Sequence, residues 1–140
     1  MNDLEFAGRL FVPELIVKDF NNWVVILKEG GTTLAHSVFI LKNNKANFSN
    51  VSHEEMAEFT DVCKWFEEKT KNLFGAEKWN YCAMMMKESF VHFQAVPRYS
   101  KEINKYGMVW QDRDWPKRPN FDKQDIPFET LLEIKKDLSD

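Results

Sequence analysis

Residues 80–99 read Asn-Tyr-Cys-Ala-Met-Met-Met-Lys-Glu-Ser-Phe-Val-His-Phe-Gln-Ala-Val-Pro-Arg-Tyr, and this stretch decides the fold. It holds most of two apolar runs, residues 79–86 and 89–96, which only Lys87 and Glu88 separate. Two strand-like runs joined by so short a polar connection favour an antiparallel hairpin with a two-residue turn. We therefore expect two neighbouring strands of an antiparallel sheet here.

The second run carries polar side chains on one face. Successive residues of a strand point to opposite faces, so Phe90, His92 and Gln94 share a face. A buried histidine or glutamine without a hydrogen-bond partner is costly, so a polar group of the sheet or of a ligand must meet this pair. A two-residue turn would set Asn80 opposite Ala95, and a one-residue change of register decides whether Asn80 faces Gln94.

Further strands and two helices flank the hairpin. Short β-branched and apolar runs predict strands over residues 14–20, 23–28 and 36–42. A helix is predicted from residue 52 to residue 75, and a last one over residues 127–138. The fold class is therefore α+β, an antiparallel sheet with one long amphipathic helix packed on it and a C-terminal helix.

The long helix has both of its ends marked in the sequence. Ser52 and Glu55 have the spacing of a capping box, and Gly75 provides a C-terminal stop. Apolar or small residues recur between them at steps of three and four, and these are Met56, Phe59, Cys63, Phe66, Thr70 and Leu73. This single stripe predicts that one side of the helix lies on the sheet.

The length of 140 residues suffices for one domain, which we expect to span residues 1–140 with its core at about residues 14–100. Residues 101–140 would form an irregular C-terminal extension plus the last helix. Nineteen Lys and Arg against 22 Asp and Glu leave a formal net charge of -3, which argues against a general nucleic-acid binder. A hydrophobic content of 44% excludes a wholly disordered chain.

The sequence also favours a cytoplasmic protein that spans no membrane. No apolar run approaches the roughly 20 residues of a membrane span, and the first ten residues lack the apolar core of a secretion signal. Cys63 and Cys82 form no Cys-x-x-Cys pair and cannot build a disulfide framework. No cluster of carboxylates and histidines predicts a metal site, and we expect no cofactor.

Residues 80–99 resemble the signature of the histidine triad (HIT) superfamily, His-φ-His-φ-His-φ-φ, where φ is apolar and Pro-Arg-Tyr often follows. Phe90 stands at the first histidine, His92 at the second and Gln94 at the third, and Pro97-Arg98-Tyr99 completes the tail. The resemblance covers about residues 14–100 and implies the HIT-like fold.

The resemblance implies a nucleotide hydrolase or nucleotidyltransferase. In that family the central histidine attacks the α-phosphorus of a nucleoside phosphate, and water or a second acceptor resolves the nucleotidyl-histidine intermediate. His92 would be this nucleophile, and Gln94 would donate a hydrogen bond to a phosphate oxygen. The substrate would be a purine nucleoside phosphate or a dinucleoside polyphosphate, and its base would lie among apolar residues of the first strands, such as Ile16 and Phe39.

Further residues are candidates for binding the nucleotide. By the resemblance, Asn80 matches an asparagine near the phosphates, His36 begins a strand that many members open with Gly-His, and Lys28 or Glu29 falls near the ribose-contacting position. From residue chemistry, the charge of Arg98 suits a phosphate or a carboxylate. Lys87 and Ser89 lie at the predicted turn, where they would touch either a leaving phosphate or only solvent.

Two of the three triad histidines are replaced, which leaves alternatives open. Phe90 removes a polar group that orients the central ring, so a backbone carbonyl would have to fix the tautomer of His92. Glutamine similarly occupies the place of Gln94 in nucleotidyl-transferring branches such as galactose-1-phosphate uridylyltransferase, which favours transfer to an acceptor or slow hydrolysis. The alternative function is a protein of the same fold that binds AMP-like ligands with negligible turnover.

A third reading makes the chain an interaction module whose working surface is the aromatic segment 110–115. The resemblance, by contrast, implies a homodimer joined edge to edge through its sheets. Trp110, Arg113 and Trp115 could then contribute to the site of the facing subunit.

Overall fold

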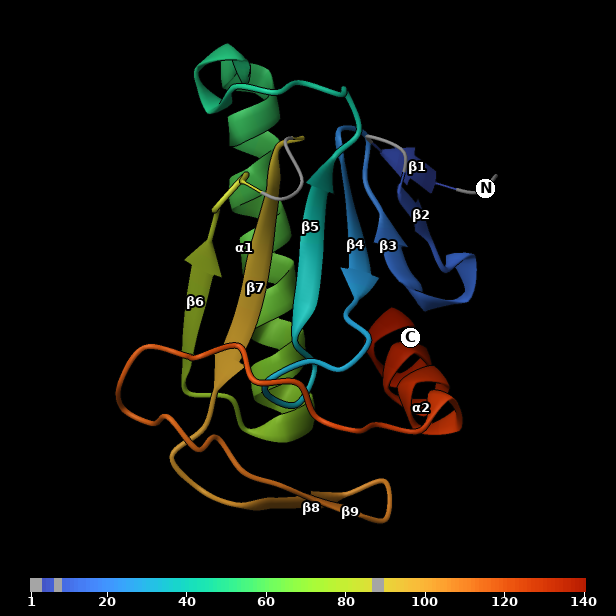
Figure 1. The fold of residues 1–140 in the computed structure, drawn as a ribbon, viewed down its shortest axis with the longest axis vertical. Helices are drawn as coiled ribbons and strands as arrows, with labels where there is room; N and C mark the ends of the chain where they lie inside the picture. Colours follow the sequence, from blue (N-terminus) through green and yellow to red (C-terminus); the bar gives the residue numbers. More distant parts are fainter. Residues whose placement is uncertain (1–3, 7–8, 87–89) are drawn as a thin grey trace.

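A five-stranded antiparallel sheet forms the centre of the molecule, in the strand order β3-β4-β5-β7-β6 (Figure 1). The computed structural model describes residues 4–6, 9–86 and 90–140. The strands of the sheet are β3 (Ile16–Asp19), β4 (Trp23–Leu27), β5 (Ser37–Leu41), β6 (Lys78–Cys82) and β7 (His92–Arg98). The long helix α1 (His53–Phe74) covers one face along its length, and α2 (Phe128–Ser139) lies beside β3 (Figure 1). The predicted α+β architecture is confirmed.

Smaller elements complete the chain. Two short hairpins pair β1 (Leu4–Phe6) with β2 (Arg9–Phe11) and β8 (Ile103–Lys105) with β9 (Met108–Trp110). Single 3-10 turns lie at η1 (Pro13–Leu15) and η2 (Phe48–Asn50). No helix within the described ranges is both long enough and apolar enough to cross a membrane.

The β8–β9 hairpin replaces irregular chain expected after residue 100. Tyr106 and Gly107 form its turn with φ values of 57° and 67°, the pair of positive φ angles that two-residue hairpins favour. Asn-Gly is the usual sequence of such a turn, so Tyr-Gly gave a weak signal. Trp110 ends the hairpin with only 2% of its surface exposed and donates its indole N–H to the Lys105 carbonyl. Trp110 is therefore a core residue and cannot belong to the working surface of an interaction module, although other residues of the segment 110–115 are exposed.

The register between β6 and β7, which the sequence left open, differs by one residue from that of a two-residue turn. Asn80 pairs opposite Val96, not Ala95, and the ladder stops at Cys82 opposite Gln94. Beyond it the described chain is not β-strand, and Met85 has a φ of 48°, which a continuous strand excludes. The expected pairing of Met86 with Ser89 and the turn at Lys87 and Glu88 involve residues 87–89, which lie outside the described ranges.

The capping signals of α1 are confirmed in detail. Ser52 Oγ accepts the Glu55 backbone N–H at 3.1 Å, while Glu55 Oε1 accepts the Ser52 backbone N–H at 2.8 Å. At the other end Gly75 has a φ of 78° and donates its N–H to the Lys71 carbonyl. These caps fix where the helix begins and ends along the sheet.

An aromatic layer joins α1 to the sheet. Phe66 is fully buried and meets Phe39 of β5 edge-on, with 5.2 Å between ring centroids. Phe59 contacts Phe93 of β7 at 4.6 Å. Phe39 therefore belongs to the core beneath the helix, which corrects its expected place in a base pocket. Strand alternation then directs His92 and Gln94 to the opposite face.

Truncating the central ring of this layer should destabilise the whole domain. We expect Phe66→Ala to lower the free energy of unfolding by about 3–5 kcal/mol, because it removes buried apolar surface and leaves a cavity. Urea unfolding followed by circular dichroism measures this change. Phe128→Ala is the matched control, since 43% of the Phe128 surface is exposed, and its change should be much smaller. Equal effects of the two variants would contradict the packing described here.

Candidate functional site

The face of the sheet opposite α1 carries a cluster of polar side chains. Along β7, His92 pairs opposite Ile40 and Gln94 opposite Val38, so both side chains lie on this face. His36, immediately before β5, reaches Gln94 from the neighbouring strand. The predicted sharing of one face by His92 and Gln94 is confirmed.

The ring of His92 has a defined tautomer. Its Nδ1 lies 2.8 Å from the Phe90 carbonyl oxygen, and only 8% of the residue is exposed. A carbonyl oxygen can only accept, so Nδ1 carries the hydrogen, and in the neutral ring Nε2 then has the lone pair. The Phe90 ring packs beside the imidazole at 4.8 Å between centroids. A backbone carbonyl thus fixes the tautomer, as expected with Phe at position 90.

His36 has the opposite tautomer, and it orients Gln94. The backbone N–H of Thr32 donates to His36 Nδ1 at 3.0 Å, so in the neutral ring the hydrogen lies on Nε2. His36 Nε2 therefore donates to Gln94 Oε1, at 2.7 Å. With its oxygen held in this way, Gln94 directs its NH2 group away from His36.

Burial keeps the His36 ring neutral. Only 2% of the residue is exposed, and this desolvation lowers the pKa of His36 to about 4. The hydrogen bond to Gln94 opposes the shift, while the charge of Lys28 adds to it. At neutral pH His36 is thus an uncharged donor to Gln94.

The loop before β5 fits closely around His36. A Cβ atom on Gly31 would lie 2.8 Å from the His36 Cβ, so only glycine leaves room for the ring at that position. Gln124 donates its amide N–H to the Thr32 carbonyl at 2.8 Å, and the Phe121 ring lies 6.0 Å from the His36 ring. The C-terminal segment (residues 111–127), which crosses the end of the sheet where β7 ends and β5 begins, therefore supports this loop (Figure 1).

Arg98 at the end of β7 is buried in an ion pair. Its guanidinium donates to both oxygens of Asp112, at 2.6 and 3.1 Å, and to the Lys117 carbonyl at 2.7 Å. Its Nη1 donates to Asn80 Oδ1 at 2.6 Å, and only 4% of the residue is exposed. Arg98 was expected to bind either a phosphate or a carboxylate, and in the structure it binds the carboxylate of Asp112. Asp112 balances its charge, so Arg98 is not an open cation awaiting a phosphate.

The residues on either side of Arg98 fasten the same end of the sheet. The backbone groups of every second residue of β7 point toward β5, as the hydrogen bond from the Leu41 N–H to the Val91 carbonyl shows. Pro97 belongs to this set but lies past the end of the β5 ladder, so its lack of an N–H leaves no ladder hydrogen bond unmade. Its carbonyl accepts the hydroxyl of Thr33 at 2.7 Å. The Tyr99 hydroxyl donates to the Leu34 carbonyl at 2.8 Å. The Pro-Arg-Tyr tail thus ties β7 to the loop that carries His36.

The remaining predicted residues are Lys28, Lys87, Ser89, Arg113 and Trp115. Lys28 is half-buried and donates its backbone N–H to the His36 carbonyl at 2.9 Å. Lys87 and Ser89 lie outside the described residues. Arg113 is exposed and Trp115 half-buried in the C-terminal segment. Within the described part of the chain, no group of three His, Cys, Asp or Glu side chains could hold a metal ion.

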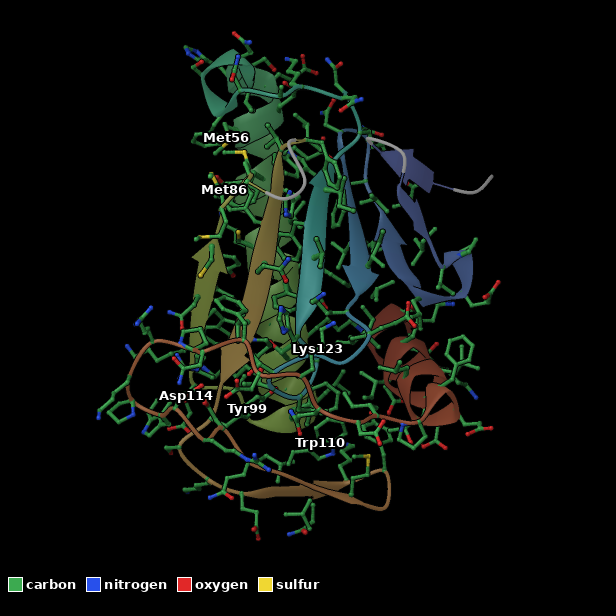
Figure 2. All side chains as sticks on the ribbon, viewed as in Figure 1. Met56, Met86, Tyr99, Trp110, Asp114 and Lys123 are labelled. Atoms are coloured by element: carbon green, nitrogen blue, oxygen red, sulfur yellow. The ribbon has the colours of Figure 1, made fainter. Side chains whose placement is uncertain are left out.

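Two hollows adjoin the loop that carries His36. A polar one of about 220 Å³ has Thr32 and Gln124 in its wall, together with Asp114 and Lys123. Figure 2 shows Asp114 and Lys123 on the C-terminal segment, at this end of the sheet. The other, of about 500 Å³, combines the carboxylate of Glu29 with apolar side chains. The apolar lining residues are Val12, Ile126, Phe128 and Leu131.

Sequence reasoning missed three residues that shape the site, namely Thr32, Asp112 and Phe121. Thr32 acts through its backbone, and Asp112 is one acid among many, so neither gives a local signal. Phe121 has a φ of 59°, a strained value for a bulky side chain, and 39% of its surface is exposed. No sequence pattern announces either property.

Solved structures of known proteins share this fold. No sequence-family model and no curated protein matches the chain, but solved structures do. A diadenosine triphosphate hydrolase from Plasmodium falciparum matches over 99% of this chain and 83% of its own, with a TM-score of 0.73 and 12% identity. A histidine triad protein from Sinorhizobium meliloti matches over 89% of this chain and 86% of its own, with a TM-score of 0.70 and 13% identity.

The NitFhit protein of C. elegans is similar as well, with a TM-score of 0.70 and 15% identity. It matches over 98% of this chain but only 29% of its own, longer chain. With the antiparallel sheet, the single covering helix and the Phe-Val-His-Phe-Gln segment in place, the chain has the histidine triad fold.

Proposed function

We propose that this chain binds a purine nucleoside phosphate or a dinucleoside polyphosphate and transfers the nucleotidyl group to His92. The observation that carries the proposal is the hydrogen bond from His92 Nδ1 to the Phe90 carbonyl, which in the neutral ring places the lone pair on Nε2, while His92 shares its face of the sheet with Gln94. An imidazole with one nitrogen held as a donor and the other unprotonated is ready to act as a nucleophile at neutral pH.

The reaction has two balanced steps. His92 Nε2 attacks the α-phosphorus, the new N–P bond forms, and the bond to the leaving phosphate oxygen breaks with its electron pair on that oxygen. The nucleotidyl imidazole is then cationic, with Nδ1–H still bound to the Phe90 carbonyl, and is itself a good leaving group. Water or a phosphate acceptor attacks the same phosphorus, loses a proton to solvent, and restores neutral His92.

Gln94 stabilises charge in these steps but moves no proton. Its oxygen is held by His36, so its NH2 group is available to an equatorial phosphate oxygen. A carboxamide cannot protonate a leaving group, so a phosphate would leave without a proton, whereas the amine of a phosphoramidate would have to take its proton from solvent. The similarity to a diadenosine triphosphate hydrolase supports a dinucleoside polyphosphate as the substrate.

The nucleoside would occupy the larger hollow beside the His36 loop. Its apolar walls suit a purine, and Glu29 offers an acceptor for ribose hydroxyls. Lys28 at the neighbouring position, and Lys87 and Ser89 in the connection between β6 and β7, would contact phosphates. Arg98 has a different role, which is developed below.

Replacing the nucleophile should abolish turnover. We expect His92→Ala to reduce the single-turnover release of AMP from diadenosine triphosphate or adenosine phosphoramidate by about a thousandfold or more. The wild-type protein should also carry label from an α-phosphorus-labelled substrate after a rapid quench. His53→Ala removes a histidine that is exposed on the first turn of α1, and should release AMP at the wild-type rate. AMP release that survives His92→Ala would overturn the mechanism.

A binding protein without turnover is the second candidate, and Phe90 favours it. Its apolar ring packs against His92 where a polar group would otherwise assist the imidazole. In that case the wild-type protein binds AMP, measured by calorimetry, yet neither releases AMP from either substrate nor becomes labelled.

The neutral state of His36 predicts a pH dependence of stability. The native pKa of about 4 lies below the unfolded value of 6.5, so the unfolded chain takes up a proton first as the pH falls. Stability is therefore lost between pH 6.5 and pH 4. We expect His36 to remove about 2 kcal/mol of unfolding free energy between pH 7 and pH 4.5. Urea unfolding at several pH values should show a flatter profile for His36→Gln, and an unchanged profile would contradict this assignment.

We also propose a homodimer, as the resemblance implies. Strand β6 is an edge of the five-stranded sheet, and Met84 and Met86 just beyond it are 70% and 84% exposed. An open edge next to exposed apolar side chains suits pairing with a second copy. Light scattering on the purified chain should give twice the monomer mass, and Met84→Glu should shift the mass toward the monomer. A monomeric wild-type chain at high micromolar concentration would contradict the proposal.

A further inference from the structure

The hydrogen bond between Arg98 and Asn80 fixes the orientation of the Asn80 carboxamide. A guanidinium group has only donors, so the Asn80 atom 2.6 Å from Arg98 Nη1 must be the oxygen, Oδ1. Arg98 cannot turn to release it, because Asp112 holds the guanidinium at two oxygens and the Lys117 carbonyl holds it at a third point.

The register of β6 against β7 determines where the Asn80 nitrogen points. Asn80 lies opposite Val96, so its side chain is on the face that holds Gln94 and Arg98, at a position between them along the strand. Since Oδ1 is held toward Arg98, the Nδ2 amino group is directed away from it, toward the Gln94 end of the site.

The Gln94 carboxamide is also oriented through its oxygen, by His36 immediately before β5. His36 Nε2–H binds its oxygen, which turns its amino group away from His36. Resting on the proposed function, we propose that Arg98 is a positioning residue: it turns the Asn80 amide so that two oriented NH2 groups, from Asn80 and Gln94, receive the oxygens of the α-phosphate.

This arrangement has a chemical consequence. Asp112 balances the charge of Arg98. At this end of the site the substrate oxygens would therefore meet neutral amide groups, whose orientation is set by Arg98 for Asn80 and by His36 for Gln94. Preorganised donors of this kind stabilise developing charge without rearranging during the reaction. A carboxylate at position 80 would keep the bond to Arg98 but would present an oxygen where the amino group was.

The substitution Asn80→Asp isolates this orientation from folding. The bond to Arg98 becomes charge-assisted, so the melting temperature without ligand should be unchanged or higher. The dissociation constant for AMP should rise by about 10-fold to 100-fold, because a donor is lost and a like charge is gained. Asn104→Asp, which adds the same charge on exposed β8, should change it less than twofold. AMP binding by Asn80→Asp as tight as the wild-type value would overturn the proposal.

An NMR experiment distinguishes a failure of the positioning role of Arg98 from a failure of the proposed function. In NMR spectra of the protein without ligand, Arg98→Lys should shift the side-chain NH2 signals of Asn80, since its oxygen loses its fixed donor. On adding AMP, the NH2 signals of both Asn80 and Gln94 should move in the wild-type protein, and only those of Gln94 in Arg98→Lys. If the chemical shifts of the Asn80 NH2 group are the same in Arg98→Lys as in the wild-type protein, the positioning role is overturned. A wild-type protein that shows no response to AMP would overturn the proposed function, even where Asn80 depends on Arg98.

Discussion

The central place of β7, between β5 and β6, is the constraint on which the site depends. Because neighbouring strands pair with both of its edges, its register is fixed, and alternate residues must serve opposite faces. One set, represented by Phe93, completes the aromatic layer under α1, while His92 and Gln94 face the other way. A slip of one residue would exchange the two sets, placing the histidine beneath the helix and moving Phe93 out of the aromatic layer.

The polar groups of this face are oriented by partners that lie behind them. A backbone carbonyl sets His92, a backbone N–H sets His36, and His36 in turn sets Gln94. Neither backbone group can reverse its role, so the tautomers follow from the fold and not from the side chains alone. Phe90 and Gln94, where the resemblance would place histidines, are thus compatible with an ordered site, since main-chain groups and an amide orient the polar side chains.

The sequence predicted the parts of this structure that depend on local patterns. The α+β class, the capped helix from Ser52 to Gly75 and the shared face of His92 and Gln94 all follow from spacing and alternation. The register of β6 against β7 could not be predicted in this way, because the connection between the two strands is longer than the two residues of a tight turn. The Arg98–Asp112 pair was equally hidden, since tertiary structure alone brings the C-terminal segment beneath β7. Local signals thus located His92 and Gln94 but not the groups that orient the residues around them.

The contact of Phe121 with His36 makes the C-terminal segment a part of the site. The ring lies against an imidazole whose neutrality depends on the exclusion of water. A chain cut by a protease before Phe121 would keep all the strands of the sheet and every triad position, yet its His36 would be hydrated and open to protonation in mildly acidic solution. Protonated at Nδ1, the ring could no longer accept the Thr32 N–H, so the imidazole that donates to Gln94 would lose the contact that fixes its own position. The integrity of the tail would then decide whether an otherwise complete domain holds its amide in register.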